Sequence, residues 1–187
     1  MTDTMTTSRI TPENLLELDD WHRFELIDGQ LVERNMGGQS SRTAQVINRL
    51  IDNYADNQRL GLVFTADCGY QIFTDPHKVR VPDGSFIARG RLPNDQPPPG
   101  HVRIPPDLVV EVVSPNDLAW MIDEKVADFL AAGVRVVWVV YPATRTVHVY
   151  RPGAEAKRLT AGETLSGEDV LPGFACAVAQ LFGWESQ

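Results

Sequence analysis

One carboxylate in this chain stands in an otherwise apolar stretch. Glu111 lies inside the run Leu-Val-Val-Glu-Val-Val at 108–113, and strand alternation places Val109 and Val113 on its face. Burying a carboxylate among valines costs several kcal/mol unless a cation or strong hydrogen-bond donors compensate. Two interpretations are open. Glu111 lies at a sheet edge, where it reaches solvent or an arginine, or it is a metal ligand or catalytic acid at the centre of a sheet.

A metal site needs a second hard oxygen ligand, and two Pro-Asp pairs offer one. Asp107 lies four residues before Glu111, which is about 13 Å along a strand at roughly 3.3 Å per residue. That is too far to share one Mg²⁺, whose oxygen ligands lie at about 2.1 Å, so Asp107 is better interpreted as a strand-start residue. Asp83 follows Pro82 at the end of another predicted strand. Sheet pairing can bring it beside Glu111, so Asp83 is the better partner.

The third candidate is Lys125, which lies within the apolar stripe of a predicted helix. Met121 is one turn before it and Phe129 one turn after it. A lysine in such a stripe usually extends its ammonium group past the apolar stem into solvent. The alternative is that the ammonium group points across the sheet towards the Glu111 face, where it could order a nucleophilic water or a phosphate.

Several common catalytic motifs are missing from the sequence. It contains no G-x-x-x-x-G-K-[ST] phosphate loop, no G-x-G-x-x-G and no G-x-S-x-G nucleophile elbow. The two cysteines are too few for a disulfide framework or a zinc knuckle. The histidines are scattered without metal-ligand spacing: His22, His77, His101 and His148. Zinc hydrolysis, nucleotide-driven chemistry and a serine triad are therefore disfavoured.

Length and composition favour one globular domain. The chain has 187 residues, 43% of them hydrophobic and 22% charged, which excludes a disordered or low-complexity protein. We expect a single domain over 1–187 with its core at about 11–182. No apolar run reaches the 18 residues of a membrane span, and the first twenty residues lack the features of a signal peptide. A cytoplasmic location is the expectation.

The net charge restricts how this chain could bind nucleic acid. Lys plus Arg number 17 and Asp plus Glu 25, giving −8, whereas nucleic-acid binders usually carry a basic surplus. Binding must therefore depend on a local patch or on carboxylates neutralised by metal. The one locally basic stretch flanks Asp83, is free of other acids between 78 and 91, and is suited to phosphate contacts; it comprises Lys78, Arg80, Arg89 and Arg91. A solvated face is the alternative for these residues.

The elements that must position these residues indicate an α/β or α+β fold with a mixed sheet. Thr11-Pro12 caps a short helix, and Asp28-Gly29 joins a hairpin of 23–27 and 30–34. Ser40 or Ser41 can cap a helix that runs to about Asn57. Further strands are predicted at 62–65, 70–73, 79–81, 85–88, 107–113, 135–140, 146–150 and near 158, helices at 118–132 and 177–182, and a proline-rich loop at 91–106. Strands 107–113 and 135–140 with helix 118–132 form a parallel βαβ unit.

The chain resembles the Uma-two restriction endonuclease family, a branch of the PD-(D/E)xK nuclease superfamily. No one motif is highly specific, but their order and spacing together are, from about Thr11 to Phe182. The matching stretches are Phe24–Gly29, Val79–Phe86, Pro106–Pro115, Glu124–Val134, Val137–Val140, Gly162–Leu165 and Leu171–Phe174. The sequence differs from the family at Thr43, Phe129 and Tyr141.

The resemblance implies a restriction-endonuclease-like mixed sheet flanked by helices, and Mg²⁺- or Mn²⁺-dependent hydrolysis of DNA by a homodimer. Asp83 and Glu111 match the metal-binding acids, and Glu25 matches a recurrent acid that acts as an outer ligand or helps Lys125. The superfamily's lysine usually lies two residues after the second acid, where this chain has Val113. Lys125 would take its place. The rival interpretation is a catalytically degenerate nuclease fold that serves as a dimeric nucleic-acid-binding or interaction module.

Overall fold

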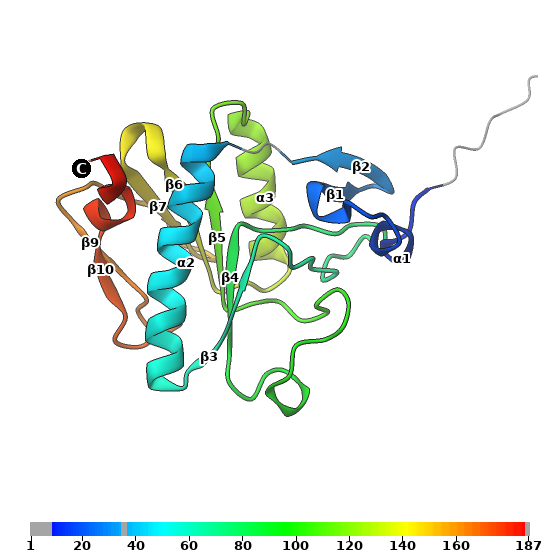
Figure 1. Ribbon diagram of the computed structural model, residues 1–187, viewed down its shortest axis with the longest axis horizontal. Coiled ribbons are helices and arrows are strands. Elements are labelled where there is room, and N and C mark those ends of the chain that lie inside the picture. The colour runs from blue at the N-terminus through cyan, green and yellow to red at the C-terminus, as the bar shows by residue number, and fades with distance from the viewer. Residues whose placement is uncertain (1–8, 35–36, 186–187) are drawn as a thin grey trace, which may run out of the picture.

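A six-stranded mixed sheet forms the centre of the molecule (Figure 1). The computed structural model describes residues 9–34 and 37–185. In spatial order the strands are β3 (Gly61–Thr65), β4 (Gly84–Ala88), β5 (Leu108–Val112), β6 (Val136–Tyr141), β7 (Thr146–Tyr150) and β8 (Lys157–Leu159). β5 and β6 are parallel and the other neighbours antiparallel. The βαβ prediction is confirmed. Glu111 lies on an inner strand, so its placement at a sheet edge is wrong.

Two helices cover the faces of this sheet, and they divide the residues of β5 between two apolar clusters. Val110 and Val112 pack in one cluster with Ile47 of α2 (Gly38–Gln58). Val109 packs in the other with residues of α3 (Ala119–Ala131). Because side chains alternate along a strand, Glu111 points to the α3 face with Val109.

The N-terminal segment adds a small separate layer. Thr11 caps α1 (Pro12–Leu16), and after the 3-10 helix η1 (Trp21–Arg23) come β1 (Phe24–Ile27) and β2 (Gln30–Glu33). The two strands pair with each other as a hairpin outside the main sheet. Asp28 and Gly29 both have positive φ, at 50° and 76°, which is the backbone that a two-residue hairpin turn requires. The predicted hairpin is confirmed.

The remaining elements are short. The proline-rich segment contains the 3-10 helix η2 (Pro93–Asp95), and η3 (Pro142–Thr144) precedes β7. A second two-stranded sheet pairs β9 (Thr164–Ser166) with β10 (Ala175–Ala177), and η4 (Val178–Glu185) follows it. No helix within 9–34 or 37–185 is long and apolar enough to cross a membrane.

Two predicted strands and one predicted helix start are wrong. Residues 70–73 and 79–81 form no strands, and Tyr70 instead makes single bridges to Arg80 and Val102. α2 begins at Gly38 with Gly37 as its N-cap. Ser40 does not cap the helix, because its hydroxyl bonds the carbonyl of Gly37 and the hydroxyl of Ser114, at 2.9 and 2.7 Å.

Candidate functional site

The pairing of β4 with β5 places Asp83 opposite Glu111. Gly84 is paired with Val110, so one step further in the same antiparallel register Asp83 stands across from Glu111. Residues directly opposite in such a pair have Cβ atoms about 5 Å apart on one face. Asp83 Oδ2 accepts a hydrogen bond from the main-chain N–H of Val112 at 2.7 Å. The carboxylate of Asp83 is therefore fixed directly before β4 begins.

Glu111 is buried with only part of its hydrogen-bonding capacity used. Glu111 is 3% exposed, and its Oε2 lies 3.3 Å from Nζ of Lys125. The other oxygen, Oε1, is buried and has no hydrogen-bond donor among the described residues. Burial raises the pKa of Glu111 to about 7, with Lys125 opposing the shift and the Asp83 and Glu25 carboxylates adding to it. Glu111 is thus a buried acid with one carboxylate oxygen to which no described residue donates a hydrogen bond.

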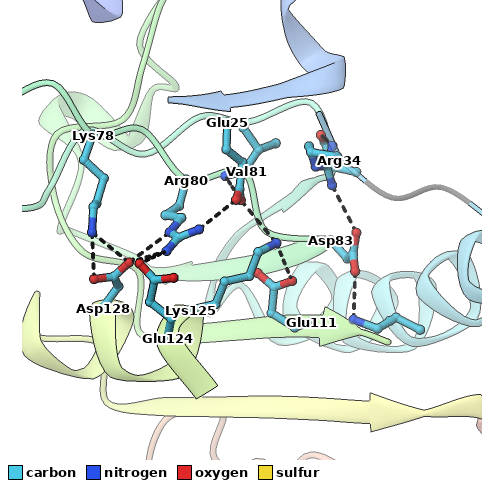
Figure 2. Close-up of polar contacts among 12 residues, drawn as sticks. Glu25, Arg34, Lys78, Arg80, Val81, Asp83, Glu111, Glu124, Lys125 and Asp128 are labelled. Atoms are coloured by element: carbon cyan, nitrogen blue, oxygen red, sulfur yellow. Dashed lines mark hydrogen bonds and ion pairs between the residues drawn. The ribbon is translucent and has the colours of Figure 1, made fainter. Parts of the chain in front are cut away.

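Lys125 lies between two carboxylates from distant parts of the chain. Its Nζ is 3.2 Å from Oε1 of Glu25 and 3.3 Å from Oε2 of Glu111, as Figure 2 shows. Burial alone would lower the pKa of Lys125, but Glu111, Glu25 and Asp83 outweigh it and raise the pKa above its ordinary value. The ammonium group therefore stays charged. It does not extend into solvent, since its side chain is 18% exposed.

Glu25 connects the N-terminal hairpin to this group. Its Oε1 also accepts the main-chain N–H of Val81 at 3.0 Å, and its Oε2 accepts Nη1 of Arg80 at 3.0 Å. Burial alone would raise the pKa of Glu25, but Lys125 and Arg80 lower it below its ordinary value. Glu25 is consequently an ionised partner of Lys125.

Arg80 extends the network from Glu25 to α3. Its Nη2 lies 2.6 Å from Oδ2 of Asp128 and 3.3 Å from Oε1 of Glu124. Lys78 bonds the same Asp128 at 3.0 Å. Arg80 is 4% exposed, so in this structure its guanidinium group does not lie on the surface. It supports the site through its contacts with Glu25 and Asp128.

The other two predicted phosphate-binding residues lie elsewhere. Arg89 is exposed and pairs with Asp95 at 3.6 Å. Arg91 bonds Asp107 at 2.7 Å, and Asp107 also accepts the main-chain N–H of Ala88. Asp107 is buried at the start of β5 with these partners, in keeping with its interpretation as a strand-start residue. Phosphate binding by Lys78, Arg80, Arg89 and Arg91 stays a prediction.

Sequence reasoning missed Arg34, which contacts Asp83 directly. Its Nη2 lies 3.1 Å from Oδ1 of Asp83, and its Nη1 donates to the carbonyls of His22 and Ala66 at 3.1 and 2.9 Å. Asn48 on α2 holds the same acid from another side, because its Nδ2 donates to the carbonyl of Asp83 at 2.8 Å. Burial is the main cause of a raised pKa for Asp83, with Lys125 and Arg34 opposing it.

The donor set suits a hard divalent cation that retains water. Mg²⁺ is usually held by one or two carboxylates together with waters and substrate phosphates. Asp83 and Glu111 supply two carboxylates, and Oε1 of Glu111 is without a donor in the described part of the chain. Within 9–34 and 37–185, no group of three or more His, Cys, Asp or Glu side chains could itself enclose a metal ion. The fit is therefore to an open two-carboxylate site.

Comparisons with known proteins agree with this architecture. The model of the Uma2 family, described as "Putative restriction endonuclease", matches residues 12–179. A crystal structure of a protein from Anabaena variabilis, described as a "putative nuclease belonging to DUF820", superposes with a TM-score of 0.75 at 23% sequence identity. The match covers 94% of this chain and 98% of that one. No curated protein matches.

Proposed function

Since the chain belongs to the Uma2 family of restriction-endonuclease-like proteins, we propose that it hydrolyses DNA phosphodiester bonds with Mg²⁺ or Mn²⁺. One observation carries the proposal: a buried carboxylate, Glu111, on an inner strand, with Oε1 lacking a donor among the described residues and with Asp83 opposite. A fold does not specify an activity. This pair of acids next to a charged lysine is a feature that suits metal-dependent phosphate chemistry.

Asp83 and Glu111 would hold the ion, and Glu25 would hold the lysine. A bound divalent ion lowers the pKa of a coordinated water and offsets charge on the phosphate. Lys125, fixed between Glu25 and Glu111, orients the attacking water or stabilises charge that develops on the phosphate oxygens. We assign Glu25 the positioning of Lys125 and not metal binding, since its oxygens are engaged by Lys125, Val81 and Arg80.

The rival function is a non-enzymatic nucleic-acid-binding or interaction module, which the net charge of −8 favours. A cleavage assay on plasmid and single-stranded DNA with Mn²⁺ separates the two. We expect cleavage by the wild type and by Asp123→Asn, an exposed acid on α3, but none by Asp83→Asn or Glu111→Gln. Cleavage by either site variant at the wild-type rate, or a folded wild type that binds Mn²⁺ and cuts neither substrate, contradicts the proposal.

A further inference from the structure

A hollow of about 700 Å³ opens beside Asp83. It lies against residues 38–52 of α2, and its lining includes Arg34, Asn48, Arg49, Val63, Asp83 and Val112, with two further acids, Asp52 and Asp67. Its volume is within the roughly 300–1,000 Å³ of pockets that bury small organic molecules. Asp83 therefore faces both the proposed metal site and a space large enough for part of a substrate.

The cations of this hollow differ from those that the sequence indicated. Lys78 and Arg80 are bound to Asp128, and Arg91 is bound to Asp107. In contrast, Arg49 is exposed on α2 and makes no ion pair with a described residue. Arg34 has Asp83 as its only acidic partner in the described chain. These two arginines are the basic side chains that line the hollow.

The guanidinium group of Arg34 has other partners that would hold it in position if its contact with Asp83 were lost. Its Nη1 is held by the carbonyls of His22 and Ala66, which no ion on Asp83 would disturb. Its Nη2 contacts Asp83 Oδ1 at 3.1 Å, so the guanidinium group occupies a position beside an oxygen that a metal ion would bind. Like charges at such short range repel strongly in a partly buried site. A cation on Asp83 would thus weaken the Nη2 contact, and the freed donor would be available to a ligand in the hollow, which Arg34 lines.

We propose that the hollow binds the nucleotide adjoining the cleaved phosphate, and that Arg34 transfers its Nη2 contact from Asp83 to a phosphate oxygen of the strand. The inference rests on the proposed function, and it states where the DNA substrate would bind. A guanidinium group suits phosphate because its planar N–H donors match the phosphate oxygens. Arg49 would meet the neighbouring phosphate at the rim, and Val63 and Val112 offer apolar contact to sugar or base.

The test separates metal affinity from strand affinity. Mn²⁺ binding is measured by calorimetry, and binding of a fluorescent single-stranded oligonucleotide by anisotropy with Ca²⁺ in place of Mn²⁺. We expect Arg34→Gln to bind Mn²⁺ several-fold more tightly, since a competing cation is removed, and the oligonucleotide at least about tenfold more weakly. Its salt dependence should lose about 0.7 from the log–log slope, the share of one phosphate contact on a single strand.

Two further variants test the location. Ser41→Trp, at an exposed position on the hollow's wall, should weaken oligonucleotide binding and leave Mn²⁺ affinity unchanged. Arg158→Gln, on the exposed surface of β8, should change neither. A purely structural role for Arg34 would instead weaken both affinities in Arg34→Gln, and that result overturns the inference.

The two proposals fail in different ways. A folded wild type that binds no Mn²⁺ overturns the proposed function together with this inference. A wild type that binds Mn²⁺ while Arg34→Gln and Ser41→Trp bind the oligonucleotide normally overturns only the inference.

Discussion

Glu111 and Lys125 form a pair of opposite charges that is largely buried away from solvent. Taking both out of water costs several kcal/mol per ion, and their contact of 3.3 Å offsets only part of it for Glu111, whose pKa is raised mainly by burial. The lysine is compensated twice, by Glu25 and Glu111. The imbalance at this position is therefore that of the Glu111 carboxylate, whose burial is only partly offset and whose Oε1 has no donor among the described residues, and a divalent cation there would offset the rest.

This imbalance predicts how metal-free stability varies with pH. The pKa of Glu111 is about 7 in the folded protein against an ordinary 4.5. Ionisation of Glu111 therefore costs the folded protein nothing below pH 4.5, and the free energy of unfolding falls as the pH rises from there to about 7. In EDTA, Glu111→Gln should therefore gain on the wild type across this window, by about 3 kcal/mol at most. Urea unfolding at several pH values measures the difference. A gap between the two proteins that stays constant from pH 4.5 to 7.5 would contradict the burial argument.

Replacement of Lys125 tests the charged contact with the reacting group. Lys125→Met retains the apolar stem, so we expect Mn²⁺ still to bind while turnover falls about a hundredfold or more, the scale for one lost charged contact. Metal-free stability should also fall, by about 3 kcal/mol, because two buried carboxylates lose their shared cation. Cleavage rate and calorimetry measure these effects, with the exposed Lys157→Met as control. If Lys125→Met cleaved DNA at the wild-type rate, Lys125 would have only a structural role.

Residue types and spacing singled out Asp83, Glu111 and Lys125, the family resemblance added Glu25, and neither indicated Arg34. Glu111 and Lys125 stand out because a charge interrupts an apolar pattern, and Pro82 marked Asp83 at a predicted strand end, although the strand that Asp83 adjoins is β4, which begins at Gly84. Arg34 breaks no pattern, and its contact with Asp83 joins residues 49 positions apart. Nor could the sequence show that Arg80 would be buried against Glu25 and Asp128, since an arginine among polar residues usually lies on the surface.

At the scale of elements, the junction of α2 with β4 depends on a glycine next to Asp83, the proposed metal-binding acid. The side chain of Asn48 lies directly against Gly84, where a Cβ atom would collide with Oδ1 of Asn48. Only a residue without a Cβ lets Asn48 approach closely enough to hold the carbonyl of Asp83. The glycine thus sets the spacing between α2 and the site.

Gly84→Ala should therefore disturb Asp83 without touching it. We expect a loss of about 1–3 kcal/mol, as for overpacking elsewhere in a core, together with weaker Mn²⁺ binding. Gly162→Ala is the control, since nothing lies within 4 Å of its added Cβ. Thermal melts with and without Mn²⁺ measure both effects. If Gly84→Ala is disruptive because of Asn48, adding Asn48→Ser should restore much of the loss, and no restoration would contradict the packing explanation.

Elements with strong periodicity or turn chemistry were predictable, and those defined by distant pairing were not. The helix around Lys125, the two buried strands beside it and the Asp28-Gly29 hairpin follow from local pattern. Residues 70–73 and 79–81 have strand-like composition, but Val79 pairs with Leu26 and Tyr70 with both Arg80 and Val102. Their hydrogen bonds are divided among three segments, so no regular ladder forms.

For the whole molecule, the predicted homodimer has a candidate surface. Among the described residues, the exposed large hydrophobic side chains are Leu16, Leu118 and Trp120, at 37%, 53% and 60%. Leu118 and Trp120 lie together at the start of α3. The apolar hairpin around Phe24 is a weaker candidate, because Phe24 packs partly against the apolar cluster of Leu15, Leu26 and Val79.

A duplex cutter needs two active sites to sever both strands, so we expect a dimer through the α3 surface. Light scattering at micromolar concentration should show twice the mass of the chain, and Trp120→Glu should reduce it to that of a monomer by placing like charges across the interface. Thr164→Glu, a substitution at an exposed position on β9, is the control. A wild type that is monomeric at these concentrations contradicts the prediction.

The main-chain amide of Val112, which donates to Asp83 Oδ2 at 2.7 Å, gives the proposed metal site a spectroscopic reporter of its own. A cation on that carboxylate withdraws electron density from the hydrogen bond, so the ¹⁵N–¹H resonance of Val112 should shift on titration with Mg²⁺. The amide of Val81, bonded to Glu25 at 3.0 Å, should move far less if Glu25 serves Lys125 and not the ion. Two backbone signals in one spectrum thereby distinguish the carboxylate that binds metal from the carboxylate that holds the lysine, with no substrate present.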